Sequence, residues 1–360
     1  MPIIEKLSVQ NFSAFHQLEW NDLGSLNVIT GLNSTGKTQL LKLLYAISRG
    51  FEEKIQRLSS GIPTQPGEVL GYITHIRSKI WGTFLPVTKT PEPLILQGYS
   101  EALIELTIKK QMVNIELKPQ TFSLNALPEP VSITDIEAYA IKCTFIPAKE
   151  VLSIFDAIVE TREGSKQLSA FDDTYYDLVK DFRLPVAQQL TGEEPYTDYF
   201  HNITEGGKIE YTDNQLWFVK DKMKLSMHQT AEGIRKISIF DRLIRNHRIQ
   251  LNQGNCVIFL DEPEANLHPE AIITFAEMLH DFAQNGVQIF LATHSYFMLK
   301  RLEQLAKEHS TDYTMLDLRK DESGRIQAQQ SLLCQGLPPN PIIEQSLELY
   351  KKDVDLVLGN

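Results

Sequence analysis

One segment of the chain, Gly31-Leu32-Asn33-Ser34-Thr35-Gly36-Lys37-Thr38, matches the pattern G-x-x-x-x-G-K-[ST] at every fixed position. Glycines let the backbone curl until successive N–H groups point at phosphate oxygens. The lysine of the pattern reaches the β- and γ-phosphates, and the final hydroxyl ligates Mg²⁺. The segment therefore predicts an ATP-binding loop whose contacts come from Gly31, Asn33, Ser34, Thr35, Gly36, Lys37 and Thr38.

The residues on either side of this loop strengthen the interpretation. An apolar stretch at 26–30 predicts a strand that runs directly into the glycines. After the loop, apolar residues recur at helical spacing and the run is expected to end at Gly50. A helix in this place offers the positive end of its dipole to the same phosphates.

A second motif begins with the apolar strand predicted at 256–260 and ends in Asp261, Glu262 and Pro263. An exposed acidic turn after a buried strand is the structural alternative. In a chain that also carries a phosphate loop, we expect Asp261 to hold Mg²⁺ through water. Glu262 is expected to orient and polarise the attacking water, as general-base carboxylates do in phosphoryl transfer.

A third motif, Thr293-His294-Ser295, follows a second apolar strand predicted at 287–292. The stretch between Glu262 and His294 has room for one helix, predicted at 269–284, and one strand, which favours neighbouring parallel strands. His294 is then placed to reach the γ-phosphate of a nucleotide at the ends of the strands. A surface histidine without function is the alternative. Both strands are nearly all apolar, as expected when helices cover both faces of a sheet.

A fourth segment, Thr230–Lys236, precedes the acidic motif. The order of the four motifs resembles that of ABC-type ATPases of the SMC, RecF and OLD (overcoming lysogenization defect) group. Their pattern Ser-x-Gly-Glu/Gln is presented to the ATP held by a second subunit. Here Ala231 stands at the serine position and Ile234 at the acidic or amide position, while Gly233 is retained. The resemblance implies a head-to-tail dimer with two composite ATP sites.

Two further stretches resemble the same group. The segment 264–269 is similar to the one after the catalytic glutamate, and 145–150 is similar to the strand exit that carries a γ-phosphate-sensing loop, although no glutamine stands there. The resemblance implies an α/β, ABC-type P-loop ATPase head. Its expected parts are a mixed or parallel central sheet, an N-terminal antiparallel β part and an inserted, mostly helical lobe.

We expect residues 1–360 to form a single domain of this type. Its expected parts are N-terminal strands and P-loop (1–50), a helix and β-hairpin insertion (51–150), a helical lobe (151–230), the helix that starts at the Gly233 segment together with the acidic motif and the histidine motif (231–310), and C-terminal strands and helix (311–360).

Composition limits the partners and the cellular compartment expected for the protein. The formal net charge is −11, which disfavours a surface that coats nucleic acid throughout. The three cysteines are far apart and form no metal-ligand pattern, as expected of thiols in a reducing compartment. The start lacks the pattern of a secretory signal, and no apolar run is long enough to span a membrane. We therefore expect a cytoplasmic protein without a membrane partner.

Three functions remain open at this stage. The motif set resembles the ATPases of Septu, retron-associated and PARIS-type antiphage systems, which work with a separately encoded nuclease or toxin effector. The stretch after His294 is short for a Toprim nuclease domain, so we expect no nuclease activity in this chain alone. Nucleic acid is then a partner that the chain contacts directly or through the effector.

The second function is a RecF-like repair ATPase that clamps DNA directly. It requires a basic face, for which the candidates are Arg235, Lys236, Arg242, Arg245 and Arg248. The third and remote alternative is the ATPase subunit of a transporter.

Overall fold

The computed structural model describes residues 2–59, 70–88, 90–125, 138–164, 170–186, 199–200, 204, 206–213 and 215–338, with a few positions beyond 342. A six-stranded sheet with the strand order β14-β13-β3-β12-β11-β7 forms its centre. The five strands from β13 to β7 run parallel, and β14 pairs antiparallel with β13 at the edge. The strands are β3 (Leu26–Gly31), β7 (Lys142–Ile146), β11 (Cys256–Asp261), β12 (Val287–Ala292), β13 (Thr314–Lys320) and β14 (Ile326–Leu332).

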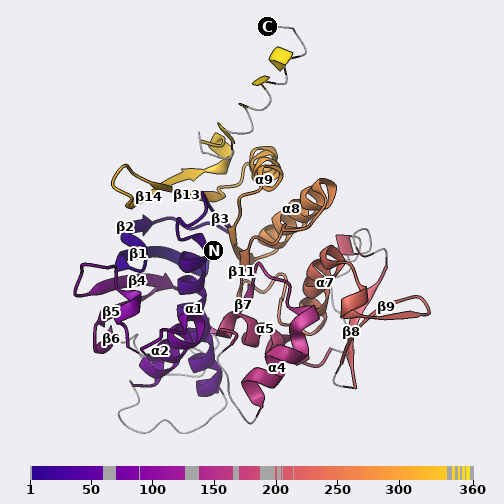
Figure 1. Cartoon of the computed structure of the whole chain (residues 1–360), viewed down its shortest axis with the longest axis horizontal. Coiled ribbons are helices and arrows are strands. Elements are labelled where there is room, and N and C mark those ends of the chain that lie inside the picture. The colour runs from indigo at the N-terminus through magenta and orange to yellow at the C-terminus, as the bar shows by residue number, and fades with distance from the viewer. Residues whose placement is uncertain are drawn as a thin grey trace.

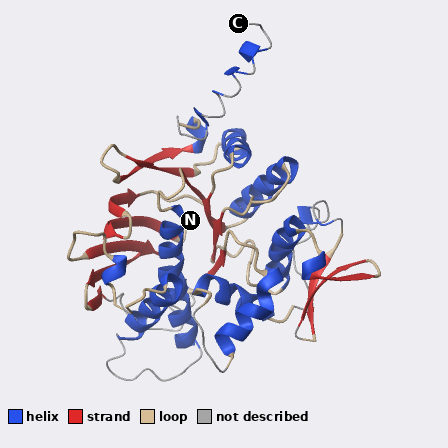
Figure 2. Cartoon of the chain, viewed as in Figure 1, coloured by secondary structure: helices blue, strands red, loops and turns tan. Residues whose placement is uncertain are grey.

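A second sheet is antiparallel and has five strands in the order β2-β1-β4-β5-β6. Figure 2 shows its strands gathered on one side of the molecule, with most of the helices on the other. On β4, inward-facing apolar residues alternate with exposed ones, the period of a sheet with one buried face. The strands are β1 (Ile4–Phe12), β2 (Phe15–Trp20), β4 (Ala102–Ile108), β5 (Gln111–Lys118) and β6 (Thr121–Asn125).

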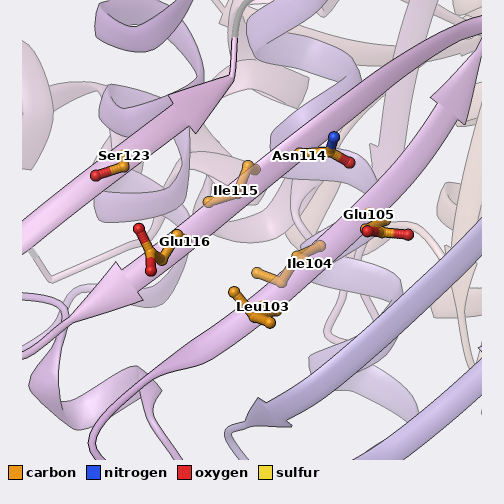
Figure 3. A pocket seen from close by; sticks show the side chains of 7 residues that line it. All are labelled: Leu103, Ile104, Glu105, Asn114, Ile115, Glu116 and Ser123. Carbon is orange, nitrogen blue, oxygen red and sulfur yellow. The ribbon is translucent and has the colours of Figure 1, made fainter.

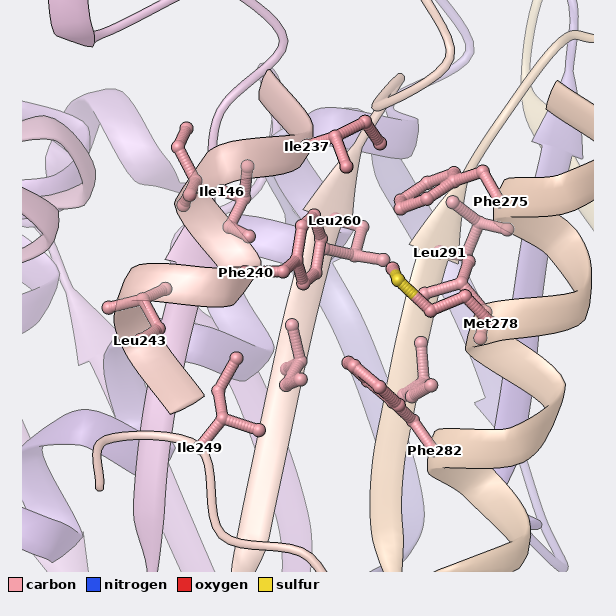
Figure 4. Close-up of a cluster of buried hydrophobic side chains, with 14 of the residues drawn as sticks. Ile146, Ile237, Phe240, Leu243, Ile249, Leu260, Phe275, Met278, Phe282 and Leu291 are labelled. Carbon is pink, nitrogen blue, oxygen red and sulfur yellow. The ribbon is translucent and has the colours of Figure 1, made fainter. Parts of the chain in front are cut away.

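Helix α1 (Lys37–Ser59) lies between the two sheets. It contributes to one hydrophobic cluster that joins β1, β4 and one face of the central sheet. Helices α7 (Glu232–Arg245) and α8 (Pro269–Gln284) cover the opposite face, where Phe240, Phe275 and Phe282 pack around Leu260 (Figure 4). Successive residues of β11 therefore face different clusters: Val257 and Phe259 pack toward α1, and Ile258 and Leu260 pack toward α7 and α8. This two-sided burial explains why β11 and β12 are apolar at nearly every position, with Gln288 and the terminal Asp261 as the exceptions.

These observations confirm the predicted fold class: a mixed central sheet, an N-terminal antiparallel sheet and an inserted lobe. The lobe contains α4 (Phe155–Glu163) and α5 (Asp173–Arg183). The prediction that this region is mostly helical missed a three-stranded antiparallel sheet, which Figure 1 shows at the edge of the molecule beside α7. Its strands are β8 (Lys208–Thr212), β9 (Gln215–Lys220) and β10 (Met223–Ser226).

The strands of the lobe are short and joined by tight turns, which makes them weak signals in the sequence. Ile209, Leu216 and Phe218 are buried in the cluster that also contains α7. Asp213 and Asp221 in the two turns have positive φ angles of 55° and 53°, a conformation that Asp and Asn tolerate better than most residues. Alternating apolar residues on both sides of Asp213 and Asp221 are the pattern that predicts these hairpins.

Two further predictions differ from the structure or lie outside it. The helix after the phosphate loop does not end at Gly50 but continues to Ser59. The predicted insertion that starts at residue 51 therefore begins inside α1, and residues 60–69 lie outside the described residues. Most of the predicted C-terminal helix also falls outside the described residues. Within the described part of the chain, no helix combines the length and apolarity needed to cross a lipid bilayer.

Gly50 permits α1 to pack closely against α2 (Leu70–Phe84). A Cβ atom at position 50 would lie 2.6 Å from the Cα of Ile76 and 2.9 Å from its backbone nitrogen. Because these atoms belong to the backbone, a rotamer change of Ile76 cannot make room. Glycine at this position therefore serves the helix crossing and does not end the helix.

We predict that Gly50→Ala lowers the free energy of unfolding by about 1–3 kcal/mol, the usual cost of overpacking. Intrinsic helix propensity alone would give the opposite sign, a gain of about 1 kcal/mol. Urea unfolding followed by circular dichroism measures the difference, with Glu160→Ala on the exposed side of α4 as the control. A gain in stability for Gly50→Ala would contradict the close crossing.

Candidate active site

The phosphate loop connects β3 to α1 through backbone conformations that favour glycine. The φ angles of Gly31, Ser34 and Gly36 are 145°, 62° and 92°. A Cβ atom on Gly31 would lie 2.3 Å from the backbone oxygen of Leu318, and one on Gly36 would lie 2.6 Å from the ring of Phe15. Both glycines are thus required by close neighbours as well as by φ.

A pocket of about 280 Å³ lies against this loop. It is lined by Asn33, Ser34, Thr35, Gly36, Lys37, Thr38, Gln39 and Glu262. The first turn of α1 starts here and contains no acidic side chain, so the positive end of the helix dipole is available to an anion. The size and lining of the pocket suit a phosphate group.

The ammonium group of Lys37 is held over the loop by the loop itself. Its Nζ donates hydrogen bonds to the backbone oxygens of Gly31 at 2.9 Å and Leu32 at 3.1 Å. Burial lowers the pKa of Lys37, while the nearby carboxylates of Glu262 and Asp261 oppose the shift. The side chain is therefore fixed beside the pocket by the backbone of the loop.

Thr38 and Asp261 form the part of the site that could hold a metal ion. The Thr38 hydroxyl is 3.0 Å from each carboxylate oxygen of Asp261. Burial raises the pKa of Asp261 to about 6, and the Thr38 hydrogen bond opposes that shift. Hydroxyl and carboxylate oxygens beside a phosphate pocket fit Mg²⁺, which takes oxygen ligands and completes its shell with water and phosphate.

No group of three or more His, Cys, Asp or Glu side chains suited to a metal is found in the described part of the chain. A cation held by Thr38 and Asp261 would therefore depend on phosphate and water for its other ligands. That dependence is typical of nucleotide-bound Mg²⁺.

Glu262 and His294 meet at the same edge of the central sheet. The Oε1 atom of Glu262 is 3.0 Å from Nδ1 of His294. Glu262 adopts a positive φ of 46°, which is uncommon for a non-glycine residue and occurs where surrounding contacts impose it. One such contact is its backbone N–H, which donates to Ala292 O at 2.9 Å. The carboxylate is thus fixed at the pocket wall with an imidazole beside it.

Gly233 lies apart from the pocket of its own chain. It belongs to the first turn of α7, where a Cβ atom would lie 3.0 Å from Cδ2 of Leu267. Ala231 precedes the helix and provides no side-chain cap. The start of α7 is tied to the turn after Glu262, because Asn266 Nδ2 donates to Glu232 Oε1 at 2.9 Å. The structure brings together the predicted residues of the other motifs, whereas Gly233 is not among the residues that line the pocket and lies against Leu267 of this turn.

The basic face proposed for direct DNA binding is not a surface feature. Each of its five side chains makes hydrogen bonds inside the chain. Arg235 donates to Met227 O and Thr230 O, Lys236 to Ala265 O, Arg242 to Phe182 O and Leu184 O, Arg245 to Asp241 and Ile209 O, and Arg248 to Glu52, Thr144 and Cys143 O. These five candidates therefore do not form the exposed basic face that the RecF-like alternative requires.

A second hollow, of about 270 Å³, lies on strands β4, β5 and β6 (Figure 3). Glu105 and Glu116 contribute carboxylates to its lining, and no basic side chain does. Two negative charges without a cation disfavour a phosphate ligand. The hollow beside Lys37 is the better nucleotide pocket.

Sequence reasoning did not single out Glu264 as a site residue. Its carboxylate accepts a hydrogen bond from the hydroxyl of Thr293, the residue before His294. The signal available in the sequence was a second glutamate two residues after Glu262, but only the fold brings it to Thr293.

Parts of this chain are similar in sequence to known proteins. Residues 148–299 match the family model described as the AAA ATPase domain. This range contains Asp261, Glu262 and His294, and it begins after the phosphate loop. A stretch of 83 residues is 32% identical to the "Old nuclease" of Escherichia phage P2 and covers 23% of this chain. The match spans only 13% of the phage protein.

Two solved structures resemble the whole chain. An Smc head bound to the C-winged helix domain of ScpA gives a TM-score of 0.53 at 12% identity, covering 93% of this chain and 99% of that one. An Smc head with an extended coiled coil, bound to the C-terminal domain of ScpA derived from Pyrococcus furiosus, gives 0.52 at 11% identity, covering 98% and 99%. The chain therefore has the α/β fold of an SMC-type ABC head and carries a match to an ATPase domain.

We predict that Lys37→Ala weakens ATP binding tenfold to a hundredfold, because hydrogen bonds to charged groups contribute about 1.5–3 kcal/mol. Isothermal titration calorimetry with ATP and Mg²⁺ measures the dissociation constant. Lys118→Ala, at an exposed lysine of β5, is the matched control. Equal affinities of the two variants would contradict the position assigned to Lys37.

A second prediction isolates the metal ion. Thr38→Val removes the hydroxyl and keeps the branched shape of the side chain. We expect its affinity for ATP to be nearly the same with Mg²⁺ and with EDTA, whereas wild-type affinity depends on Mg²⁺. Retained Mg²⁺ dependence in the variant would exclude Thr38 as a ligand.

Proposed function

We propose that this chain binds ATP with Mg²⁺ and hydrolyses it to ADP and phosphate. One observation carries the proposal: three parallel strands end at one edge of the sheet, beside a pocket that Lys37, Thr38 and Glu262 line. Asp261 contacts Thr38 and His294 contacts Glu262 at this edge. Lys37 binds the β- and γ-phosphates, while Thr38 and Asp261 hold Mg²⁺. The cation, when bound, neutralises charge on the phosphates during transfer.

In the proposed reaction, Glu262 acts as general base. It accepts a proton from the attacking water, whose oxygen bonds to the γ-phosphorus as the bond to the β–γ bridging oxygen breaks. His294 holds the Glu262 carboxylate through the 3.0 Å contact, and we propose that its imidazole reaches the γ-phosphate of bound ATP. ADP carries away the bridging oxygen as the leaving group.

The proposed active form is a head-to-tail dimer in which Gly233 of each chain contacts the ATP of the other. Support comes from the position of Gly233 on a turn away from its own pocket, and from the likeness in fold to SMC heads. The first turn of α7 offers backbone N–H groups to a phosphate, as helix N-termini do. Ala231 and Ile234 remove two polar side chains from this contact, which favours slow turnover.

The proposed biological role is control of a separately encoded effector, such as a nuclease, in an antiphage complex. Support comes from the motif order and from the 83-residue similarity to the phage P2 protein. The RecF-like alternative required the five basic residues of α7 and its following loop as a DNA-binding face. Because those side chains are engaged within the chain, no observed feature favours that alternative.

The central test is Glu262→Gln, which keeps the shape of the side chain and removes the base. We expect unchanged ATP affinity and a turnover rate lower by about 100-fold or more, within the usual contribution of a general base. A coupled phosphate-release assay measures the rate. Glu322→Gln, at an exposed residue, is the control. A variant as active as wild type would remove Glu262 from this role.

The dimer has its own test in the Glu262→Gln background, where ATP persists. We expect sedimentation velocity to show a dimer with ATP and Mg²⁺, and a monomer without them. Adding Gly233→Gln should abolish the dimer, because a long side chain then occupies the proposed contact. Calorimetry must show that this double variant still binds ATP. Dimers that persist with Gly233→Gln would rule out the head-to-tail contact at this turn.

A further inference from the structure

Glu264 is a buried carboxyl group beside the active site that the proposed reaction does not use. It lies three residues after Asp261, and only 5% of its surface is exposed. Its Oε1 atom accepts a hydrogen bond from Thr293 Oγ1, whereas no partner for Oε2 is found among the described residues. Burial raises the pKa of Glu264, and the Thr293 hydroxyl opposes the shift. Such a group is costly to bury without a specific role.

Thr293 is the point at which Glu264 acts on the site. Its backbone N–H donates to Ile29 O of β3 at 3.0 Å. Its hydroxyl oxygen accepts the N–H of Ser295 at 3.0 Å while donating to Glu264. The hydroxyl thus has both a donor and an acceptor partner, which fixes its rotamer and the backbone on either side of His294.

The residues that follow His294 are held in place as well. Ser295 caps α9 (Tyr296–Glu308) by accepting the N–H of Met298 at 3.3 Å. The segment from Thr293 to Ser295 is therefore held at both ends. Only the side chain of His294 projects from it, with 54% of that side chain exposed, and Nδ1 contacts Glu262.

We propose that Glu264 is a positioning residue that, through Thr293, aims His294 at the carboxylate of Glu262. This inference rests on the proposed ATPase function and adds to it a residue that never touches the nucleotide. Two carboxylates of one turn have different tasks: Glu262 faces the pocket, and Glu264 faces the loop that follows β12.

The backbone around Glu264 has an independent anchor, which makes its side chain testable by itself. Lys236 of α7 donates to Ala265 O at 3.0 Å, and Asn266 contacts Glu232. Replacing the Glu264 side chain therefore removes the contact with Thr293 and leaves these ties to α7 in place.

The kinetic test uses Glu264→Leu, Thr293→Val and their combination. We expect each single variant to lower kcat tenfold to a hundredfold, with KM and the ATP dissociation constant within threefold of wild type. The double variant should be no slower than the slower single variant, since both remove the same interaction. Thr293→Ser retains the hydroxyl and should recover most of the rate.

Thr314→Val is the matched control for loss of a buried threonine hydroxyl, because Thr314 Oγ1 donates to Asn27 Oδ1 away from the pocket. It should leave kcat near the wild-type value. Full activity of Glu264→Leu, or additive losses in the double variant, would overturn the positioning role.

A second readout needs no turnover. Imidazole ¹⁵N spectra report the environment of Nδ1 in each of the nine histidines, and His294→Gln assigns the relevant signal. In Glu264→Leu and Thr293→Val we expect the His294 signal to shift and the signals of the other histidines to stay in place. An unchanged His294 signal would overturn the inference. If the wild type hydrolyses no ATP, the proposed function fails, and the spectra still decide whether Glu264 positions His294.

Discussion

Two backbone hydrogen bonds beyond the ends of the strands hold the site together. Glu262 N–H donates to Ala292 O, and Thr293 N–H donates to Ile29 O. They continue the parallel ladder β11-β12-β3 by one residue, so the acidic turn, the histidine loop and the phosphate loop leave the sheet side by side. The positive φ of Glu262 is the local cost of this arrangement, and the ladder holds the residue in that conformation. Every proposed contact with nucleotide depends on this alignment.

The ladder is stable because the central sheet is covered on both faces. Side chains of β11 and β12 alternate between the cluster around α1 and the cluster around α7 and α8. Inside these layers an unpaired polar group would be costly, and the buried amide side chains of the strands, such as Asn27 and Gln288, are accordingly hydrogen-bonded. Buried ion pairs then fix both α1 and α2 to α5 of the lobe: Arg49 of α1 contacts Asp181 at 3.0 Å, and Lys79 of α2 contacts Asp177 at 2.7 Å. Burial alone would raise the pKa of Asp177, but Lys79, Arg49 and Lys180 outweigh it and hold the pKa below its usual range.

The sequence was informative wherever the signal is local. An apolar stretch followed at once by glycines or carboxylates indicates a buried strand and the edge of the sheet at which its functional residues lie. The strands that lead to Lys37, Asp261 and His294 could therefore be predicted. Tertiary contacts decided the remainder. Gly50 has the chemistry of a helix end but serves a helix crossing. Arg242 and Arg248 were candidates for a basic face, but their hydrogen-bond partners lie far away along the chain and bury them. Glu264 shows the same limit, because Thr293 becomes its neighbour only in the folded sheet.

The turn at 264–267 links two parts of the molecule that sequence motifs treat separately. On one side, Glu264 contacts the loop of His294. On the other, Asn266 and Leu267 contact the first turn of α7, where Gly233 lies. A displacement of Thr293 would therefore be transmitted to the same short turn that supports Gly233, since close-packed segments transmit strain. In the proposed head-to-tail pair, this shared turn gives the two ATP sites a direct mechanical connection, and it does so with side chains that never contact the nucleotide.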